Sequence, residues 1–251
     1  MRVALLIEYD GKDFSGWQVQ PGERTVQGEL EAAFKKVVRK ESPILGSGRT
    51  DTGVHSSGMV AHIDLADEWR NDLYQLQHSI NGVTGYDVVL KDMRIVPDDF
   101  HARFSAISRE YVYTVLHGKT AIYRELVWQV WGDVDFEAME KAASELSGKM
   151  DFTSYSKQTD AVKDYFCTIM TSEWEKKDDK LLYTIKANRF VRGMVRAIVG
   201  SMLEVGKGRL SLTDFKALLT NPQELERAKF IAPAHGLILR RVEYPSELNL
   251  W

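Results

Sequence analysis

The sequence has 251 residues, enough for one large domain or two of ordinary size. Hydrophobic residues make up 44% and charged residues 27%, which excludes a disordered or fibrous protein. The single cysteine, Cys167, excludes an internal disulfide and favours a reducing compartment. The net charge is −3, from 33 Lys and Arg against 36 Asp and Glu, and as a total it disfavours a nucleic-acid partner.

The first residues carry an apolar run that is too short, and too soon interrupted by Glu8, for a signal peptide. No stretch of 18 apolar residues follows, so the sequence predicts no membrane-spanning helix. Together with the lone cysteine, these features predict a cytoplasmic protein.

The first hundred residues predict the order strand, helix, loop, strand, helix, strand. The first helix should begin after Thr25, a residue suited to the N-cap position. Three glycines within eight residues predict a loop between Gly46 and Gly53. The predicted elements are a strand at 2–9, a helix whose apolar face runs from Val26 to Val38, a strand at 59–64, a helix containing Leu73, Leu76 and Ile80, and a strand at 88–96.

The rest of the sequence predicts a similar mixture of strands and helices. Alternating tyrosines and valines predict a strand at 109–116, with which 127–130 could pair. A charged turn at 176–180 predicts a hairpin between 169–174 and 181–186. The other predicted elements are a helix capped by Asp135 with Phe136, Met139, Ala143 and Leu146 on its inner face, a helix capped by Ser211, a helix with Pro222 in its first turn, and a strand at 237–242.

The longest predicted helix covers about residues 189–205, between Asn188 as N-cap and Gly206 as stop. Strands and helices in this order predict an α+β fold with mainly antiparallel sheets. Because the order recurs, we expect two halves, residues 1–105 and 106–251, although no low-complexity linker marks the boundary.

A basic stripe is predicted on that long helix, because Arg189, Arg192 and Arg196 fall at the spacing i, i+3 and i+7. The window 181–203 contains four Lys or Arg and no acidic residue. Two interpretations stay open, a solvated helix face or a surface that binds RNA phosphates. A local basic surface is compatible with the negative total charge, since the excess acids lie elsewhere.

The segment Gly46-Ser-Gly-Arg-Thr-Asp-Thr-Gly-Val-His55 joins a flexible backbone to a cluster of polar side chains. Its glycines allow sharp turns and let a ligand approach the backbone. It lacks the Lys-Ser/Thr pair of a P-loop and is not a dinucleotide fingerprint. Asp51 is either a structural residue that caps the loop or pairs with Arg49, or the carboxylate of an active site, and chemistry alone leaves both open.

The part Gly48-Arg-Thr-Asp-Thr-Gly-Val-His55 resembles the signature of the tRNA pseudouridine synthase A family. The sequence departs from that family at Thr52, Ser56, Ser57 and Met59, and these changes should leave the loop's path intact. Seven further motifs resemble the family in the same order over nearly the whole chain. They are Tyr9-Asp-Gly, Gly16-Trp-Gln, Thr25-Val-Gln-Gly-Glu-Leu30, Phe100-His-Ala-Arg-Phe-Ser105, Asp151-Phe-Thr-Ser154, Met194-Val-Arg-Ala-Ile-Val-Gly200 and Ala232-Pro-Ala-His-Gly236.

The resemblance implies an enzyme that isomerises uridine to pseudouridine at positions 38, 39 and 40 of the tRNA anticodon stem-loop. This intramolecular reaction involves no net redox change and consumes no water, so we expect no cofactor and no metal. The resemblance also implies homodimers in which one tRNA contacts both subunits. The implied fold is α+β, with two RRM-like, ferredoxin-like halves that form a continuous, mainly antiparallel sheet flanked by helices, and an active-site cleft between the halves.

The resemblance places the catalytic carboxylate at Asp51, which must be ionised whether it attacks as a nucleophile or removes a sugar proton. A nearby cation would keep a buried carboxylate ionised, and the resemblance places that cation at Arg196. Arg49 is then expected to contact RNA or to help extrude the base. Tyr111 corresponds to the family's tyrosine that stacks on the target base, although spacing alone favours an ordinary strand tyrosine, and only the resemblance separates it from Tyr113 on the same face of the strand.

Several other reactive residues are predicted to be structural. His55 and His62 have no cysteine or carboxylate at metal-ligand spacing, so we predict no zinc site and expect His55 to brace the loop. Cys167 and Trp17 are predicted to pack, and His235 to support a Pro/Gly turn.

Two other functions stay open. An RNA-binding protein without catalysis would use the same basic residues and aromatics but would not need Asp51. A nucleoside or glycoside hydrolase would also cleave at an anomeric carbon, but most glycoside hydrolases need two carboxylates, and Asp51 alone stands out.

Overall fold

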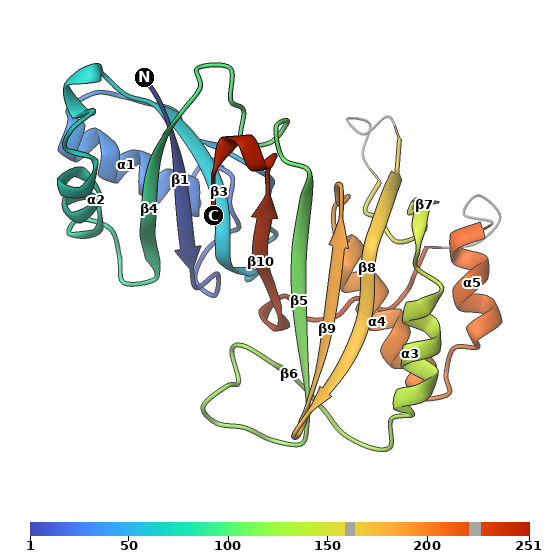
Figure 1. The fold of residues 1–251 in the computed structure, drawn as a ribbon. Coiled ribbons are helices and arrows are strands. Elements are labelled where there is room, and N and C mark those ends of the chain that lie inside the picture. Colours follow the sequence, from blue (N-terminus) through green and yellow to red (C-terminus); the bar gives the residue numbers. More distant parts are fainter. Residues whose placement is uncertain (159–163, 221–226) are drawn as a thin grey trace. The chain divides into compact units, whose positions relative to one another are not determined.

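The computed structural model describes residues 1–158, 164–220 and 227–251 (Figure 1). These residues divide into two units, Met1–Ser108 with Ile238–Trp251, and Arg109–Leu237. Each unit combines mainly antiparallel strands with helices, which confirms the predicted α+β class. No helix within the described residues is long and apolar enough to cross a membrane. The predicted helix at Pro222 lies outside the described residues.

The first unit contains a sheet with the strand order β4-β1-β3-β10 and the helices α1 and α2. β1 pairs antiparallel with β3 and β4, β2 adds to β3, and β10 runs parallel to β3. The bounds are β1 (Arg2–Tyr9), α1 (Val26–Val38), β2 (Leu45–Gly46), β3 (His55–Asp64), α2 (Leu73–Asn81), β4 (Val88–Val96) and β10 (Leu237–Glu243). A short 3-10 helix, Asp67–Trp69, precedes α2, and another, Ser246–Leu248, follows β10.

Helix α1 begins where the sequence predicts. The Thr25 hydroxyl accepts a hydrogen bond from the Gly28 N–H at 3.3 Å, which satisfies one donor of the first turn. The apolar face of α1 is buried, and Leu30 and Phe34 are fully excluded from solvent. Burial of a side chain of that size contributes about 1.5–3 kcal/mol to folding, so this face holds α1 in the unit.

Strand β3 begins at His55, earlier than the predicted start at Met59, because its first residues pair with β10 (Figure 1). The Ser56 hydroxyl donates a hydrogen bond to the Leu239 carbonyl at 3.1 Å. A Cβ atom on Gly58 would lie 2.3 Å from a β10 carbonyl, so a glycine is needed there. The predicted division at residue 105 assigns β10 to the second half, whereas this strand belongs to the first unit.

Within its described residues, the second unit contains the strands β6-β5-β9-β8-β7, the α-helices α3, α4 and α5, and a short 3-10 helix, Ala234–Gly236. β5 pairs parallel with β6, as predicted in outline, and antiparallel with β9; the β8–β9 hairpin is also confirmed. Helix α3 packs against α4, α5 and β8, and Asp135 and Ser211 cap α3 and α5 as predicted. The bounds are β5 (Ser108–His117), β6 (Trp128–Val130), α3 (Phe136–Ser144), β7 (Gly148–Asp151), β8 (Phe166–Lys177), β9 (Lys180–Ala187), α4 (Met194–Gly206) and α5 (Leu212–Thr220).

The prediction of one long basic helix is wrong, because α4 begins at Met194. Asn188 caps no helix: its N–H donates to the Thr168 carbonyl at 3.2 Å, and its side-chain oxygen accepts from the Thr168 N–H at 2.8 Å. Gly193 then adopts a left-handed conformation, with φ of +75°, directly before the first turn. Arg189 and Arg192 therefore precede the helix and do not share a helical face with Arg196.

His62 of β3 is a buried titratable group, and burial, together with the Arg2 charge, lowers its pKa to about 4. Its ordinary pKa is about 6.5, so between pH 6.5 and 4 the unfolded chain binds a proton that the folded chain does not. We expect the free energy of unfolding, measured by urea titration, to fall as the pH is lowered through this window. His62→Gln should flatten that fall, whereas the exposed His78→Gln should not; equal slopes would contradict the assignment.

Candidate active site

The loop that carries Asp51 lies between β2 and β3 of the first unit, and backbone hydrogen bonds fix its path. The Asp51 carbonyl accepts a hydrogen bond from the Val54 N–H at 3.1 Å, which closes a turn. The Thr50 carbonyl accepts one from the Trp17 N–H at 3.2 Å. A second loop, residues 10–24, thus holds the backbone next to Asp51.

Two glycines of this second loop allow its close approach. Gly16 has φ of +91°, and a Cβ atom there would lie only 2.5 Å from the Thr50 carbonyl oxygen. A Cβ atom on Gly11 would lie 2.0 Å from the Val54 carbonyl oxygen. Real Cβ atoms do not come so close, so a side chain at either position would force the second loop and the Asp51 loop apart.

Buried aromatic side chains support the loop. The Tyr9 and Thr50 hydroxyl oxygens lie 2.8 Å apart in a buried hydrogen bond. Trp17 is 2% exposed, with its ring centroid 6.2 Å from that of Tyr9, which confirms that it packs. In the loop itself, Asp51 is half-buried, while Arg49 is exposed.

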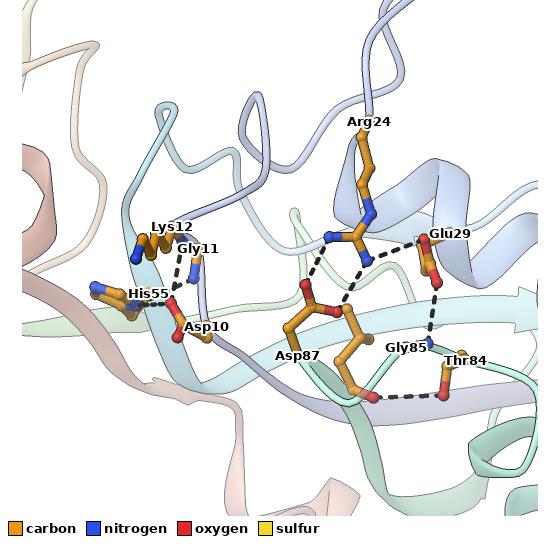
Figure 2. Close-up of polar contacts among 10 residues, drawn as sticks. Asp10, Gly11, Lys12, Arg24, Glu29, His55, Thr84, Gly85 and Asp87 are labelled. Carbon is orange, nitrogen blue, oxygen red and sulfur yellow. Dashed lines mark hydrogen bonds and ion pairs between the residues drawn. The ribbon is translucent and has the colours of Figure 1, made fainter. Parts of the chain in front are cut away.

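His55 braces the other end of the loop, as predicted (Figure 2). It is buried, and its Nδ1 lies 3.0 Å from both the Gly11 N–H nitrogen and Asp10 Oδ1. Asp10 Oδ1 also accepts a hydrogen bond from the Lys12 N–H at 3.0 Å. These contacts join the end of β1 to the start of β3.

Arg24 ties the second loop to the rest of the unit (Figure 2). Its guanidinium donates to both carboxylate oxygens of Asp87, at 2.6 and 2.9 Å, and lies 3.3 Å from Glu29. Hydrogen bonding to Arg24 lowers the pKa of the Asp87 carboxyl. The guanidinium also lies over the ring of Phe14, 4.1 Å from its centroid, and the Phe14 carbonyl accepts a hydrogen bond from Gly53 of the Asp51 loop.

In the second unit, two tyrosines that share a face of β5 differ in accessibility. Tyr113 is fully buried, its hydroxyl donates to the Pro233 carbonyl at 2.8 Å, and burial raises the pKa of its phenol far above the ordinary value. Tyr111 is half-buried, and its ring meets that of Phe190 edge-on, with centroids 5.0 Å apart. Of the pair, Tyr111 is the more accessible to solvent.

Arg196 is the one residue of α4 that is not buried. Its Nε donates to the Ala232 carbonyl at 2.7 Å, and its own carbonyl accepts from the Ala232 N–H at 3.0 Å. Its charge also acts on the Tyr113 phenol and opposes the effect of burial. The helix and the segment at Ala232 therefore orient Arg196 in a fixed position.

Arg189 and Arg192 lie on the segment between β9 and α4. Arg189 forms an ion pair with Asp164 at 3.3 Å, and its side chain is 42% exposed. Arg192 is exposed, while its carbonyl accepts a hydrogen bond from the Lys157 N–H at 3.0 Å. Both cations are on the surface, but in an irregular segment.

The predicted site residues are thus divided between the units. Asp51 and Arg49 belong to the first unit, and the other four, Tyr111, Arg189, Arg192 and Arg196, belong to the second. Cys167 is buried, which raises the pKa of its thiol to about 11 and confirms that it packs. Within the described residues, no three His, Cys, Asp or Glu side chains are grouped as metal ligands.

Sequence reasoning missed the residues that fix Asp51. Gly16, Tyr9 and Gly11 stand in motifs that the resemblance identifies, but no local pattern assigned them a role. The sequence signal is a glycine close to an aromatic residue, which occurs twice before the glycine-rich loop of Asp51, at Tyr9 with Gly11 and at Gly16 with Trp17. Only in the folded chain do these residues contact that loop.

A carboxylate on a loop that an α+β scaffold holds rigidly is typical of an enzyme active site. The family model described as tRNA pseudouridine synthase matches residues 5–105 and 142–245. The chain therefore belongs to the tRNA pseudouridine synthase family.

Several relatives carry the name tRNA pseudouridine synthase A. The protein of Parabacteroides distasonis is 42% identical over 248 residues, 98% of this chain and 97% of its own. That of Porphyromonas gingivalis is 41% identical over 251 residues, 99% of each chain. That of Halalkalibacterium halodurans is 39% identical over 243 residues, 96% of this chain and 91% of its own. The similarity thus extends over both units.

Proposed function

We propose that this protein isomerises uridine to pseudouridine at positions 38, 39 and 40 of the tRNA anticodon stem-loop, with Asp51 as its catalytic carboxylate. Membership of the family supports the reaction class. The observation that carries the assignment to Asp51 is the close contact of Gly16 and Gly11 with the backbone on either side of it.

The reaction breaks the bond between ribose C1′ and base N1, rotates the base, and joins C1′ to C5; C5 then loses its proton and N1 gains one, so that the product is an isomer of the substrate. Asp51 either attacks the substrate as a nucleophile or removes a sugar proton, and both roles need the ionised form. We propose Arg196 as the cation that keeps it ionised, with no cofactor and no metal in the reaction. The target base must leave its stack, at a cost of a few kcal/mol, before the carboxylate can reach the ribose.

The other residues act on the RNA. Stacking on the Tyr111 ring offsets the cost of extruding the base. Arg49 contacts RNA or helps extrude the base, and Arg189 and Arg192 bind phosphates. The protein works in the cytoplasm as a homodimer in which one tRNA contacts both subunits.

The direct test incubates purified protein with a tRNA transcript that has uridines at 38, 39 and 40, in EDTA and without added cofactor. Pseudouridine should form at these positions, and no free uracil should appear. Free uracil with an abasic site would favour a hydrolase, and tight binding without any chemical change would favour a non-catalytic RNA-binding protein. Pseudouridine at other positions alone would overturn the proposed specificity.

Tyr111 offers a separate prediction. Tyr111→Ala should lower kcat/KM for tRNA by roughly 5- to 150-fold, because base–aromatic stacking is worth about 1–3 kcal/mol. Tyr111→Phe should keep tRNA affinity and lower turnover only if the hydroxyl transfers a proton. The fully exposed Tyr86 supplies a control, since Tyr86→Ala should change neither quantity. Wild-type kinetics in Tyr111→Ala would remove Tyr111 from the site.

A further inference from the structure

Phe104 is a large aromatic residue of the first unit that stays open to solvent. Its side chain is 75% exposed, although its neighbours Phe100 and Ala102 are almost wholly buried. Single exposed apolar residues are common on protein surfaces, so exposure alone assigns no role. What distinguishes Phe104 is the well-ordered loop to which it belongs, residues 97–105.

The loop is held rigid by its own hydrogen bonds. The ring nitrogen Nδ1 of His101 accepts from the Arg103 N–H at 3.1 Å and from the Phe104 N–H at 3.4 Å. The His101 N–H donates to the Ser105 hydroxyl at 3.0 Å, and the Ser105 N–H donates to the His101 carbonyl at 2.8 Å. A turn closed in this way fixes the backbone on both sides of Phe104.

Buried groups anchor the same loop to the sheet. The Ala102 N–H donates to Nδ1 of His62 at 3.2 Å, and the Ala102 carbonyl accepts from the Tyr244 hydroxyl at 2.6 Å. The buried Phe100 ring packs between these two partners, 6.0 Å from His62 and 5.2 Å from Tyr244. The backbone that carries Phe104 is therefore already ordered. Ligand binding at Phe104 then costs little backbone conformational entropy.

The side chains around Phe104 are those that recognise an unpaired nucleotide. The Phe104 ring lies against the His101 imidazole, with centroids 4.4 Å apart, and the Arg103 guanidinium carbon lies over the Phe104 ring, 5.6 Å from its centroid. An exposed aromatic ring can stack on a base, and an arginine at the same ring supplies a positive charge for the phosphate. An apolar protein partner would need a wider apolar patch, whereas the ring contacts here come from the polar side chains of His101 and Arg103.

We propose that Phe104, with His101 and Arg103, forms a second stacking site that binds an unpaired base of the RNA substrate, other than the uridine that is isomerised. This inference rests on the proposed function, because it takes RNA as the ligand. The site contributes affinity for tRNA and takes no part in the bond changes at the target uridine.

The test measures tRNA affinity, KM and kcat in Phe104 variants, with a tRNA transcript as the probe. Phe104→Ala should weaken affinity and raise KM by roughly 5- to 150-fold while kcat stays within about twofold. Phe104→Tyr should restore affinity, and Phe104→Leu should not, because leucine keeps apolar bulk but has no aromatic face. Tyr74→Ala, at a side chain of α2 that is 77% exposed, is the matched control and should behave as wild type.

Phe104→Trp adds a direct readout, since stacking on a base should quench the new fluorescence when tRNA binds. Unchanged affinity in Phe104→Ala with an active wild-type enzyme would overturn the stacking site and leave the proposed function intact. Restoration by Phe104→Leu would also overturn it, because apolar bulk would then suffice. Failure of the wild-type protein to form any pseudouridine would instead count against the proposed function.

Discussion

Asp51→Asn should reduce pseudouridine formation in tRNA by about 10²–10⁴-fold or to below detection. Asparagine has nearly the same shape as aspartate, but it can neither attack the substrate as a carboxylate nor take a proton. The turn depends on the Asp51 backbone carbonyl, which the substitution keeps. The fold and the tRNA affinity should therefore stay close to wild type, and the loss should fall on kcat.

Asp13→Asn is the matched control, because Asp13 is an exposed carboxylate on the neighbouring loop. It should retain wild-type turnover and affinity. Single-turnover assays with excess enzyme separate the chemical step from tRNA binding, and circular dichroism checks the fold of each variant. A wild-type rate in Asp51→Asn would show that the carboxylate takes no part in the reaction.

Gly16→Ala should reduce turnover by about 10- to 100-fold, because a displacement near 1 Å of a reacting group can cost about 10²-fold in rate. The new Cβ atom would lie 2.5 Å from the Thr50 carbonyl oxygen, so the two loops must separate and the backbone next to Asp51 loses its close support. The φ of +91° adds strain for any residue with a side chain. Turnover should fall even at temperatures where the variant is fully folded, so the loss of stability alone will not account for it.

Gly22→Ala is the control that separates the effect of backbone strain from the effect of a steric clash with the Asp51 loop. Gly22 lies on the same loop with φ of +78°, but no heavy atom would lie within 4 Å of its Cβ atom. Both variants should lose some stability in urea titrations, and only Gly16→Ala should lose turnover at a temperature where both are folded. Equal turnover in the two variants would contradict the role assigned to the second loop.

The elements that could be predicted from the sequence are those whose signals are local. Thr25 and the apolar stripe after it define α1, and the charged turn after β8 defines the hairpin with β9. The start of β3 could not be predicted in this way. His55 and Ser56 join a strand because β10 pairs with them, and no local pattern reveals a contact across so much of the chain.

The misplaced start of α4 has a different cause. The three arginines at 189, 192 and 196 have helical spacing by coincidence. Asn188 is hydrogen-bonded to Thr168 of β8 and cannot cap a helix, and Gly193 adopts a left-handed conformation that ends the irregular segment. A glycine within a helical pattern is a weak signal, because many helices tolerate one. Here it marks the true boundary.

Much of the candidate site came from the resemblance and little from local chemistry. The proposal that Asp51 is the catalytic carboxylate depends on the specific motif that surrounds it. Spacing could not separate Tyr111 from Tyr113, whereas the hydrogen bond of Tyr113 to Pro233 and its full burial leave Tyr111 as the accessible one. The support that Gly16 gives to the loop depends on a close backbone contact, which no sequence pattern reports.

The most direct test of the central claim is a map of pseudouridines in total tRNA from cells that lack this protein. Uridines at positions 38, 39 and 40 should stay unmodified there, and the wild-type gene should restore pseudouridine while an Asp51→Asn gene expressed at the same level should not. Pseudouridine that persists at these positions without the protein, or returns with the Asp51→Asn gene, would contradict the account.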